Sequence, residues 1–211
     1  MSLLASALAA GISNNFIEGL NKSEKQSLEY FIKIAPNLLR KAGIKIEYWN
    51  GEGIDKYILY MYHKCSTIKT LLNRNSPSSV NDCFVSPNIR YNDSNGSTKF
   101  TNIDGLLEDS ISSNPLNIIT GLAGSGKTVL LKKLFIECIS KNIAKFPIFF
   151  EFREISNNDF KEKILENSII KSISVFFPGF NNDLFSYSVK NNHFYFILDG
   201  FDEISPSIRE K

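Results

Sequence analysis

The sequence has no excess of charge of either sign. Its 211 residues include 24 basic and 22 acidic side chains, which gives a formal net charge of +2. A nucleic-acid-binding domain usually carries a clear basic surplus, so this balance gives no indication of a nucleic-acid partner. The hydrophobic fraction of 43% and the charged fraction of 22% are typical of a globular chain with a packed core.

Cysteine and histidine are scarce and have no metal-ligand spacing. The three cysteines, Cys65, Cys83 and Cys138, are an odd number without paired spacing. They give neither a disulfide framework nor a zinc motif and favour a reducing compartment, where we expect buried thiols. The two histidines, His63 and His193, each lack a metal-spaced partner. We therefore interpret each as a histidine that is either hydrogen-bonded within the fold or exposed to solvent, rather than as a metal ligand.

Long apolar runs are also missing. The run from Leu3 to Ile12 is much shorter than the roughly 20 residues that a membrane-spanning helix needs. No basic residue precedes it, whereas a secretory signal begins with a positive segment. We interpret it as a small helix that packs on the chain or on a partner. No membrane partner is indicated, and a cytoplasmic location is predicted.

Residues 1–100 predict a mainly helical region. Ser23 to Gln26 fits a capping box, and apolar residues follow it at helical spacing. Pro36 lies within this pattern and predicts a kink or an early end. A second helix is predicted from Ile54 to about Asn73, followed by short extended pieces. We interpret residues 1–100 as an effector or interaction region.

Residues 101–211 alternate short apolar, β-branched runs with helical patterns. The predicted strands are 116–120, 147–152 and 194–198, and the predicted helices are 127–142, 157–177 and 183–189. Strands that alternate with helices in this way are typical of a parallel α/β sheet.

A glycine-rich loop follows the first of these predicted strands. It fits the pattern G-x-x-x-x-G-K-[ST] with Gly121, Leu122, Ala123, Gly124, Ser125, Gly126, Lys127 and Thr128. Glycines let successive backbone N–H groups converge on phosphate oxygens, and the helix that follows turns its positive end toward the same anion. Lys127 can reach the β- and γ-phosphates, and the Thr128 hydroxyl can bind Mg²⁺. The motif predicts nucleotide binding, with ATP or ADP and Mg²⁺ as cofactors.

An acidic motif follows the last predicted strand. The apolar run from Phe194 to Leu198 delivers Asp199 at its carboxyl end, which fits a Walker B motif. Asp199 would hold Mg²⁺ together with Thr128. Asp202 or Glu203 could then polarise an attacking water, so these two residues are the catalytic candidates.

Three segments together resemble NACHT domains of the STAND class of NTPases. They are the P-loop GLAGSGKT, the strand segment FPIFFEFRE and the Walker B segment FILDGFDE. The resemblance covers about residues 101–211. It implies an α/β fold whose parallel-sheet P-loop NTPase core follows the helical region.

The resemblance also implies a signalling ATPase. NACHT proteins are switches that are closed with ADP and oligomerise with ATP when a sensor domain detects a ligand. The implied partners are the nucleotide, further copies of the chain or a downstream protein. The implied setting is innate immunity or anti-phage defence, in the cytoplasm.

The chain departs from the family pattern where it ends, soon after the Walker B strand. In the related fold a later strand lies between the P-loop strand and the Walker B strand, and a helical lid follows. We therefore expect an incomplete NTPase core with exposed strand edges. On this interpretation ATP hydrolysis belongs to a longer chain, and turnover by these 211 residues alone is not expected.

Other hypotheses stay open at this point. The chain could be a truncated, non-catalytic adaptor or oligomerisation module that acts through its N-terminal helices. A small-molecule kinase or a transporter ATPase would share the P-loop, but the lid of the first and the Ser-Gly-Gly signature of the second are not found. Arg90 and Tyr91 are candidates for stacking on the base. The preference for ATP over GTP is not determined.

Overall fold

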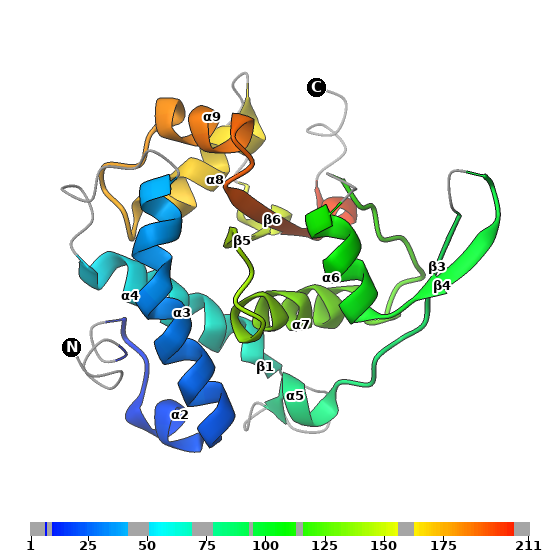
Figure 1. Cartoon of the computed structure of the whole chain (residues 1–211), viewed down its shortest axis with the longest axis horizontal. Helices are drawn as coiled ribbons and strands as arrows, with labels where there is room; N and C mark the ends of the chain where they lie inside the picture. The colour runs from blue at the N-terminus through cyan, green and yellow to red at the C-terminus, as the bar shows by residue number, and fades with distance from the viewer. Residues whose placement is uncertain are drawn as a thin grey trace. The chain divides into compact units, whose positions relative to one another are not determined.

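Figure 1 shows the computed structural model of the chain. The chain divides into two compact units. Unit 1 combines Met1–Lys64 with Ile139–Lys211, and unit 2 is Cys65–Cys138. The structure describes residues 7, 10–41, 51–68, 78–92, 95–112, 116–155 and 163–204. The predicted boundary between residues 100 and 101 lies inside unit 2. It rests on the motifs of the sequence and stays a prediction.

Unit 1 contains α2 (Asn14–Gly19) and α3 (Lys22–Lys41). A capping box starts α3, but not at the predicted residues. The Asn21 side chain accepts from the Glu24 N–H, and the Glu24 carboxylate accepts from the Asn21 N–H, both at 2.9 Å. The box is therefore built by Asn21 and Glu24 rather than by Ser23 and Gln26. Asparagine caps a helix as well as serine does, which the sequence analysis did not weigh.

Pro36 does not end α3. The helix continues one further turn to Lys41, with the proline inside it. Ala35 and Leu39, on either side of Pro36, are buried. Burial of apolar side chains stabilises this last turn and offsets the backbone hydrogen bond that proline cannot donate.

The second predicted helix is α4 (Gly51–Ser66), which passes from unit 1 into unit 2 at its end. It stops earlier than the predicted Asn73, because Thr67–Ile68 forms the short strand β1. Residues 69–73 lie outside the described residues. One side of α4 is buried through Tyr57, Ile58, Met61 and Cys65, as its apolar spacing predicts.

The sheet of unit 1 pairs β5 (Phe146–Glu151) with β6 (Phe194–Asp199) in parallel. Its register runs from Phe146 opposite Phe194 to Glu151 opposite Asp199. All six residues of β5 are buried, as in a parallel strand covered on both faces. These two strands confirm, within a residue, the strands predicted at 147–152 and 194–198.

Helices α8 (Ile164–Ser174) and α9 (Asn182–Lys190) belong to the same unit and pack on each other (Figure 1). The Asn181 side chain caps α9 by accepting from the Leu184 N–H at 3.0 Å. The ring of Phe180 contacts the rings of Phe185 and Phe194, which links this helix to β6. Aromatic residues thus form much of the core of unit 1.

Among its described residues, unit 2 contains two small antiparallel ladders and three helices. The short β1 pairs with β2 (Ser78–Ser79), and β3 (Ile89–Asn92) forms a hairpin with β4 (Thr98–Thr101). The helices are α5 (Val80–Cys83), α6 (Ile103–Ser112) and α7 (Lys127–Ser140), whose last two residues extend into unit 1. Helix α7 was predicted, whereas β4 and α6 were not.

The strand predicted at 116–120 is absent. Residues Leu116–Thr120 have no secondary structure, and the side chains of Leu116 and Ile118 are 75% and 79% exposed. A strand exists only through the hydrogen bonds of a neighbouring strand, and no ladder of the described residues includes this segment. The strand predicted from the β-branched pattern at 116–120 was therefore wrong.

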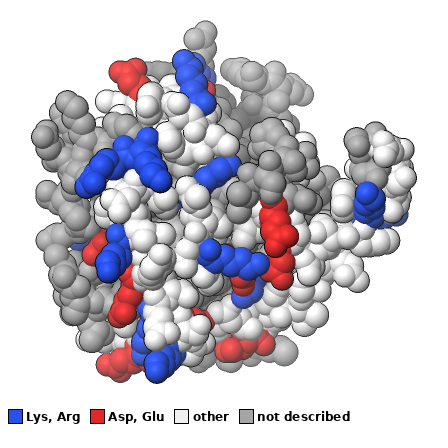
Figure 2. Space-filling model, viewed as in Figure 1, with Lys and Arg blue, Asp and Glu red and all other residues white. Residues whose placement is uncertain are grey.

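Lysine, arginine and acidic side chains are interspersed on the face shown in Figure 2. This mixture agrees with the small net charge, and no large field of one sign occurs among the described residues of that face. Within the part of the chain that the structure describes, no helix is long and apolar enough to cross a membrane.

Candidate nucleotide site

The glycine-rich loop of unit 2 is exposed and sharply turned. Gly124 and Gly126 have φ angles of +76° and +87°, in the left-handed region that residues with a Cβ avoid. A Cβ atom on either glycine would contact nothing within 4 Å. The backbone conformation, rather than crowding, therefore requires glycine at both positions.

Lys127 is the first residue of α7 and folds back on the loop. Its Nζ donates to the carbonyl oxygens of Gly121 at 2.9 Å and Leu122 at 3.2 Å. The Ser125 N–H also donates to the Leu122 carbonyl, which closes a turn inside the loop. The ammonium group is thus held at the loop by neutral carbonyl oxygens, which anionic phosphate oxygens could replace as stronger acceptors.

The start of α7 presents the chemistry of an anion site. The first N–H groups of a helix have no earlier carbonyl within the helix to bind, and the helix dipole places positive charge there. Thr128 is exposed in this first turn. Farther along, the side chains of α7 are anchored: Leu130, Leu134, Cys138 and Ile139 are buried. The loop therefore begins a well-packed helix.

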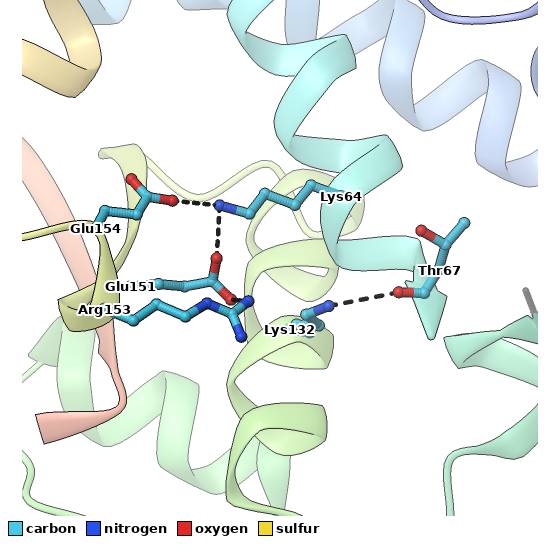
Figure 3. A network of polar contacts seen from close by, with 6 residues as sticks. All are labelled: Lys64, Thr67, Lys132, Glu151, Arg153 and Glu154. Atoms are coloured by element: carbon cyan, nitrogen blue, oxygen red, sulfur yellow. Dashed lines mark hydrogen bonds and ion pairs between the residues drawn. The ribbon is translucent and has the colours of Figure 1, made fainter. Parts of the chain in front are cut away.

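Two lysines of α7 hold the earlier chain of unit 2. Lys132 donates to the Thr67 carbonyl at 3.4 Å (Figure 3), and Lys133 donates to the Asn81 side chain at 2.7 Å. Lys133 also pairs with Glu137, one turn ahead, at 2.8 Å. These contacts fix the helix after the loop and leave Lys127 as the lysine that reaches the loop carbonyls.

The acidic motif of unit 1 lies where β6 ends. Asp199 is buried, whereas Asp202 and Glu203 are exposed in the short helix η3 (Phe201–Glu203). Gly200 connects them with a φ of +79°, and the Glu203 N–H donates back to its carbonyl at 2.9 Å. The structure therefore brings the three predicted carboxylates together within one turn. It also separates one buried carboxylate from two that meet solvent.

Glu151 is a further buried carboxylate that the sequence analysis did not single out. It ends β5 in register with Asp199 at the end of β6, and only 5% of its side chain is exposed. Lys64 Nζ lies 2.7 Å from its Oε2, and Arg153 Nη2 lies 2.5 Å from its Oε1 (Figure 3). The sequence signal was present, since Glu151 ends an apolar strand just as Asp199 does.

The acidic neighbours of Lys64 affect its pKa. Burial by itself would lower its pKa, because a charged ammonium loses solvation. Hydrogen bonds to Glu151 and Glu154, together with their negative charge, outweigh burial and raise the pKa above its ordinary value. Lys64 is therefore charged at neutral pH.

Arg90 and Tyr91 lie next to each other on the exposed hairpin of unit 2. Successive residues of a strand point to opposite faces, so these two side chains cannot stack on the same face of one base. Base stacking by one of them stays a prediction.

Each motif, taken by itself, has groups that suit one part of a magnesium nucleotide. Unit 2 supplies a left-handed glycine loop, an ammonium group and a helix start, which suit phosphate oxygens. Unit 1 supplies the carboxylate of Asp199, and Mg²⁺ in nucleotide sites takes one or two carboxylates besides phosphate oxygens and water. Thr128 supplies the hydroxyl that the motif assigns to the metal.

Comparison with known proteins gives one match. Residues 116–211 match the family model of the NACHT domain. A search of the curated proteins and a search of the solved structures each found no match. The matched segment holds the glycine loop, β5, β6 and the acidic turn. The match over residues 116–211 is consistent with a NACHT protein of the STAND class of P-loop NTPases.

Proposed function

We propose that the chain binds Mg·ATP and Mg·ADP as the nucleotide-responsive part of a NACHT-type signalling switch. The observation that carries the proposal is the glycine loop of unit 2. Two left-handed glycines, a lysine held on the loop carbonyls and a helix that begins at that lysine occur together. This combination is specific to phosphate binding, and it lies inside the NACHT match.

Each predicted residue has a proposed role. The loop from Gly121 to Gly126 surrounds the phosphates with backbone N–H groups, and Lys127 neutralises the β- and γ-phosphates. Thr128 and Asp199 hold Mg²⁺, which when bound neutralises phosphate charge. Asp199 suits this role because it is buried at the carboxyl end of a parallel strand, the edge where α/β sheets bind ligands.

Glu203 or Asp202 positions the attacking water in our proposal. Both are exposed just after Asp199, so either carboxylate can accept a proton from water. Hydrolysis is proposed for the switch as a whole. The two candidates are separated by Glu203→Gln and Asp202→Asn, with phosphate release measured in a single turnover. The substitution that slows release while leaving Mg·ATP affinity unchanged identifies the residue.

Calorimetric titration with Mg·ATP and Mg·ADP tests the proposal directly. Lys127→Ala is expected to abolish measurable binding of both nucleotides, because it removes the phosphate-binding ammonium. Lys33→Ala, at an exposed position of α3, is the matched control and is expected to bind as the wild type does. Binding that survives Lys127→Ala, or no binding by a demonstrably folded wild type, would refute the proposal.

Signalling through self-association or through a downstream protein is the second part of the proposal. It is supported by the NACHT match. We also propose an immune or anti-phage setting in the cytoplasm, which is supported by the family resemblance alone. Sedimentation with ADP and with a non-hydrolysable ATP analogue tests self-association. Equal mass in both states would count against a nucleotide-driven assembly.

The adaptor hypothesis is the outcome if nucleotide does not bind. In that case residues 1–100 would act as an interaction module, and the glycine loop would be a remnant. A pull-down that depends on the N-terminal helices but not on Lys127 would favour it.

A further inference from the structure

Helix α4 contacts strand β5 near its start and at its end, through two residues. The Tyr57 hydroxyl donates to the Pro147 carbonyl at 3.3 Å, near the start of β5. Two turns later, Lys64 contacts Glu151 at the end of the same strand. Residues seven apart lie on one face of a helix, so one face of α4 follows β5 from its start to its end.

The contacts of Lys64 form a small ionic network. Its Nζ lies 2.7 Å from Glu151 and 2.6 Å from Glu154, and Arg153 occupies the other oxygen of Glu151 (Figure 3). Two cations thus balance two carboxylates. The side chain of Lys64 is 22% exposed and that of Arg153 is 61% exposed. Because exposed ion pairs contribute little, Lys64 is the stronger partner of the buried Glu151.

Glu151 needs such a partner because of where its strand ends. Glu151 and Asp199 are register partners, so their side chains lie on the same face of neighbouring strands about 4.8 Å apart. Two like charges directly opposite each other on a sheet are destabilising. Cations on Glu151 reduce this repulsion and keep its carboxylate engaged, which leaves Asp199 as the carboxylate proposed for the metal.

We propose that Lys64 is a positioning residue for the nucleotide site. By pairing with Glu151, it fixes the ends of β5 and β6, where Asp199 lies. It thereby links the N-terminal helices to the carboxylate that is proposed to bind the metal. This inference rests on the proposed function for its nucleotide readout. It goes beyond that function because it assigns a role to a residue that lies outside the NACHT match.

The ionic link itself is tested without nucleotide. Lys64→Met keeps the length of the side chain and removes its charge, and Glu151→Gln removes the buried partner charge. The unfolding midpoints of the two single variants and of the double variant give a double-mutant cycle. The link is supported if the unfolding midpoint of the double variant falls clearly less than the sum of the two single decreases. Additive decreases overturn it.

The positioning role is tested by Mg²⁺-dependent binding. We expect Lys64→Met to weaken Mg·ADP binding by about tenfold, the lower end for residues that orient a metal ligand. Binding of ADP in EDTA is expected to change little, Lys64→Arg to restore Mg·ADP binding, and the control Lys33→Met to match the wild type. A purely structural residue would not change the ratio of affinities with and without Mg²⁺.

Each remaining result has a definite meaning. Unchanged Mg·ADP affinity in a folded Lys64→Met variant overturns the inference and leaves the proposed function intact. Tighter Mg·ADP binding overturns it as well, because it would mean that Glu151, once released, acts as a metal ligand itself. If folded wild type binds no nucleotide, the proposed function fails first, and the positioning role falls with it.

Discussion

The two segments that carry the nucleotide motifs differ sharply in how they are packed. Strands β5 and β6 of unit 1 pair with each other, and β5 is buried at every residue. Residues 116–126 of unit 2 form neither helix nor strand, and Ile118 and Leu122 are 79% and 85% exposed. In the sequence, both segments contain an apolar run that predicts a strand next to a nucleotide-binding motif. The comparison teaches that apolar, β-branched sequence becomes a strand only where a neighbour completes its hydrogen bonds.

The largest expected effect concerns the buried strand. Phe149 is 1% exposed in the middle of β5, and Phe149→Ala should lower the free energy of unfolding by about 3–5 kcal/mol, because it leaves a cavity. Urea unfolding followed by circular dichroism measures this loss. The matched substitution Phe100→Ala, at a 67% exposed position of unit 2, should cost far less. Equal losses at the two phenylalanines would break the comparison.

A smaller effect is expected where α4 meets β5. Tyr57→Phe removes the hydroxyl that donates to the Pro147 carbonyl in a buried setting. The free energy of unfolding should fall by about 1 kcal/mol, the usual contribution of such a hydrogen bond. Tyr30→Phe, at a 53% exposed position of α3, is the control and should leave stability unchanged. No difference between the two variants would show that α4 does not anchor β5 through this bond.

The pH dependence of unit 1 gives a further test through His63. Burial lowers the pKa of His63 below its ordinary value of 6.5, and its ring meets the edge of Phe16 with centroids 4.5 Å apart. Because the unfolded chain takes up this proton first, the stability due to neutral His63 is full above pH 6.5. It is lost as the pH falls through the lowered pKa.

Thermal unfolding between pH 7.5 and 5 measures this loss. His63→Asn should flatten the slope in that window compared with the wild type, whereas His193→Asn serves as the second histidine substitution for comparison. An unchanged slope in His63→Asn would show that other groups cause the acid sensitivity.

The smallest expected effect lies in the exposed segment. Ile118→Ala should change the free energy of unfolding by no more than about 0.5 kcal/mol, as is usual for an exposed side chain. Chemical unfolding checks this, with Ile148→Ala in the buried strand β5 as the contrasting substitution. A loss at Ile118 that approaches the loss at Ile148 would mean that residues 116–120 pair as a strand in solution.

Of the two carboxylates at the strand ends, one was predicted from the sequence and the other was not. Asp199 was found because an apolar run ends in a carboxylate beside a P-loop pattern, and the structure places it at the end of β6 as predicted. Glu151 ends an equally apolar run, but no known sequence motif includes it, so its role was not predicted. Its importance depends on the register with Asp199 and on Lys64, and neither can be read from local sequence.

Local sequence by itself determined the features that depend on near neighbours. Gly124 and Gly126 adopt left-handed backbone, α7 begins at Lys127, and β5 and β6 form at the predicted places. Backbone angles, helix starts and apolar runs are set within a few residues, so the sequence pattern is sufficient for them.

Only the tertiary structure decided which segments meet. It paired β5 with β6, left residues 116–120 without a ladder, and placed Lys64 against Glu154, which lies 90 residues away. Such contacts form when distant chain segments are brought together, and their free energy depends on burial and on the charges that they meet there. The sequence pattern predicts which residues belong to the site, and tertiary packing determines which residues they contact.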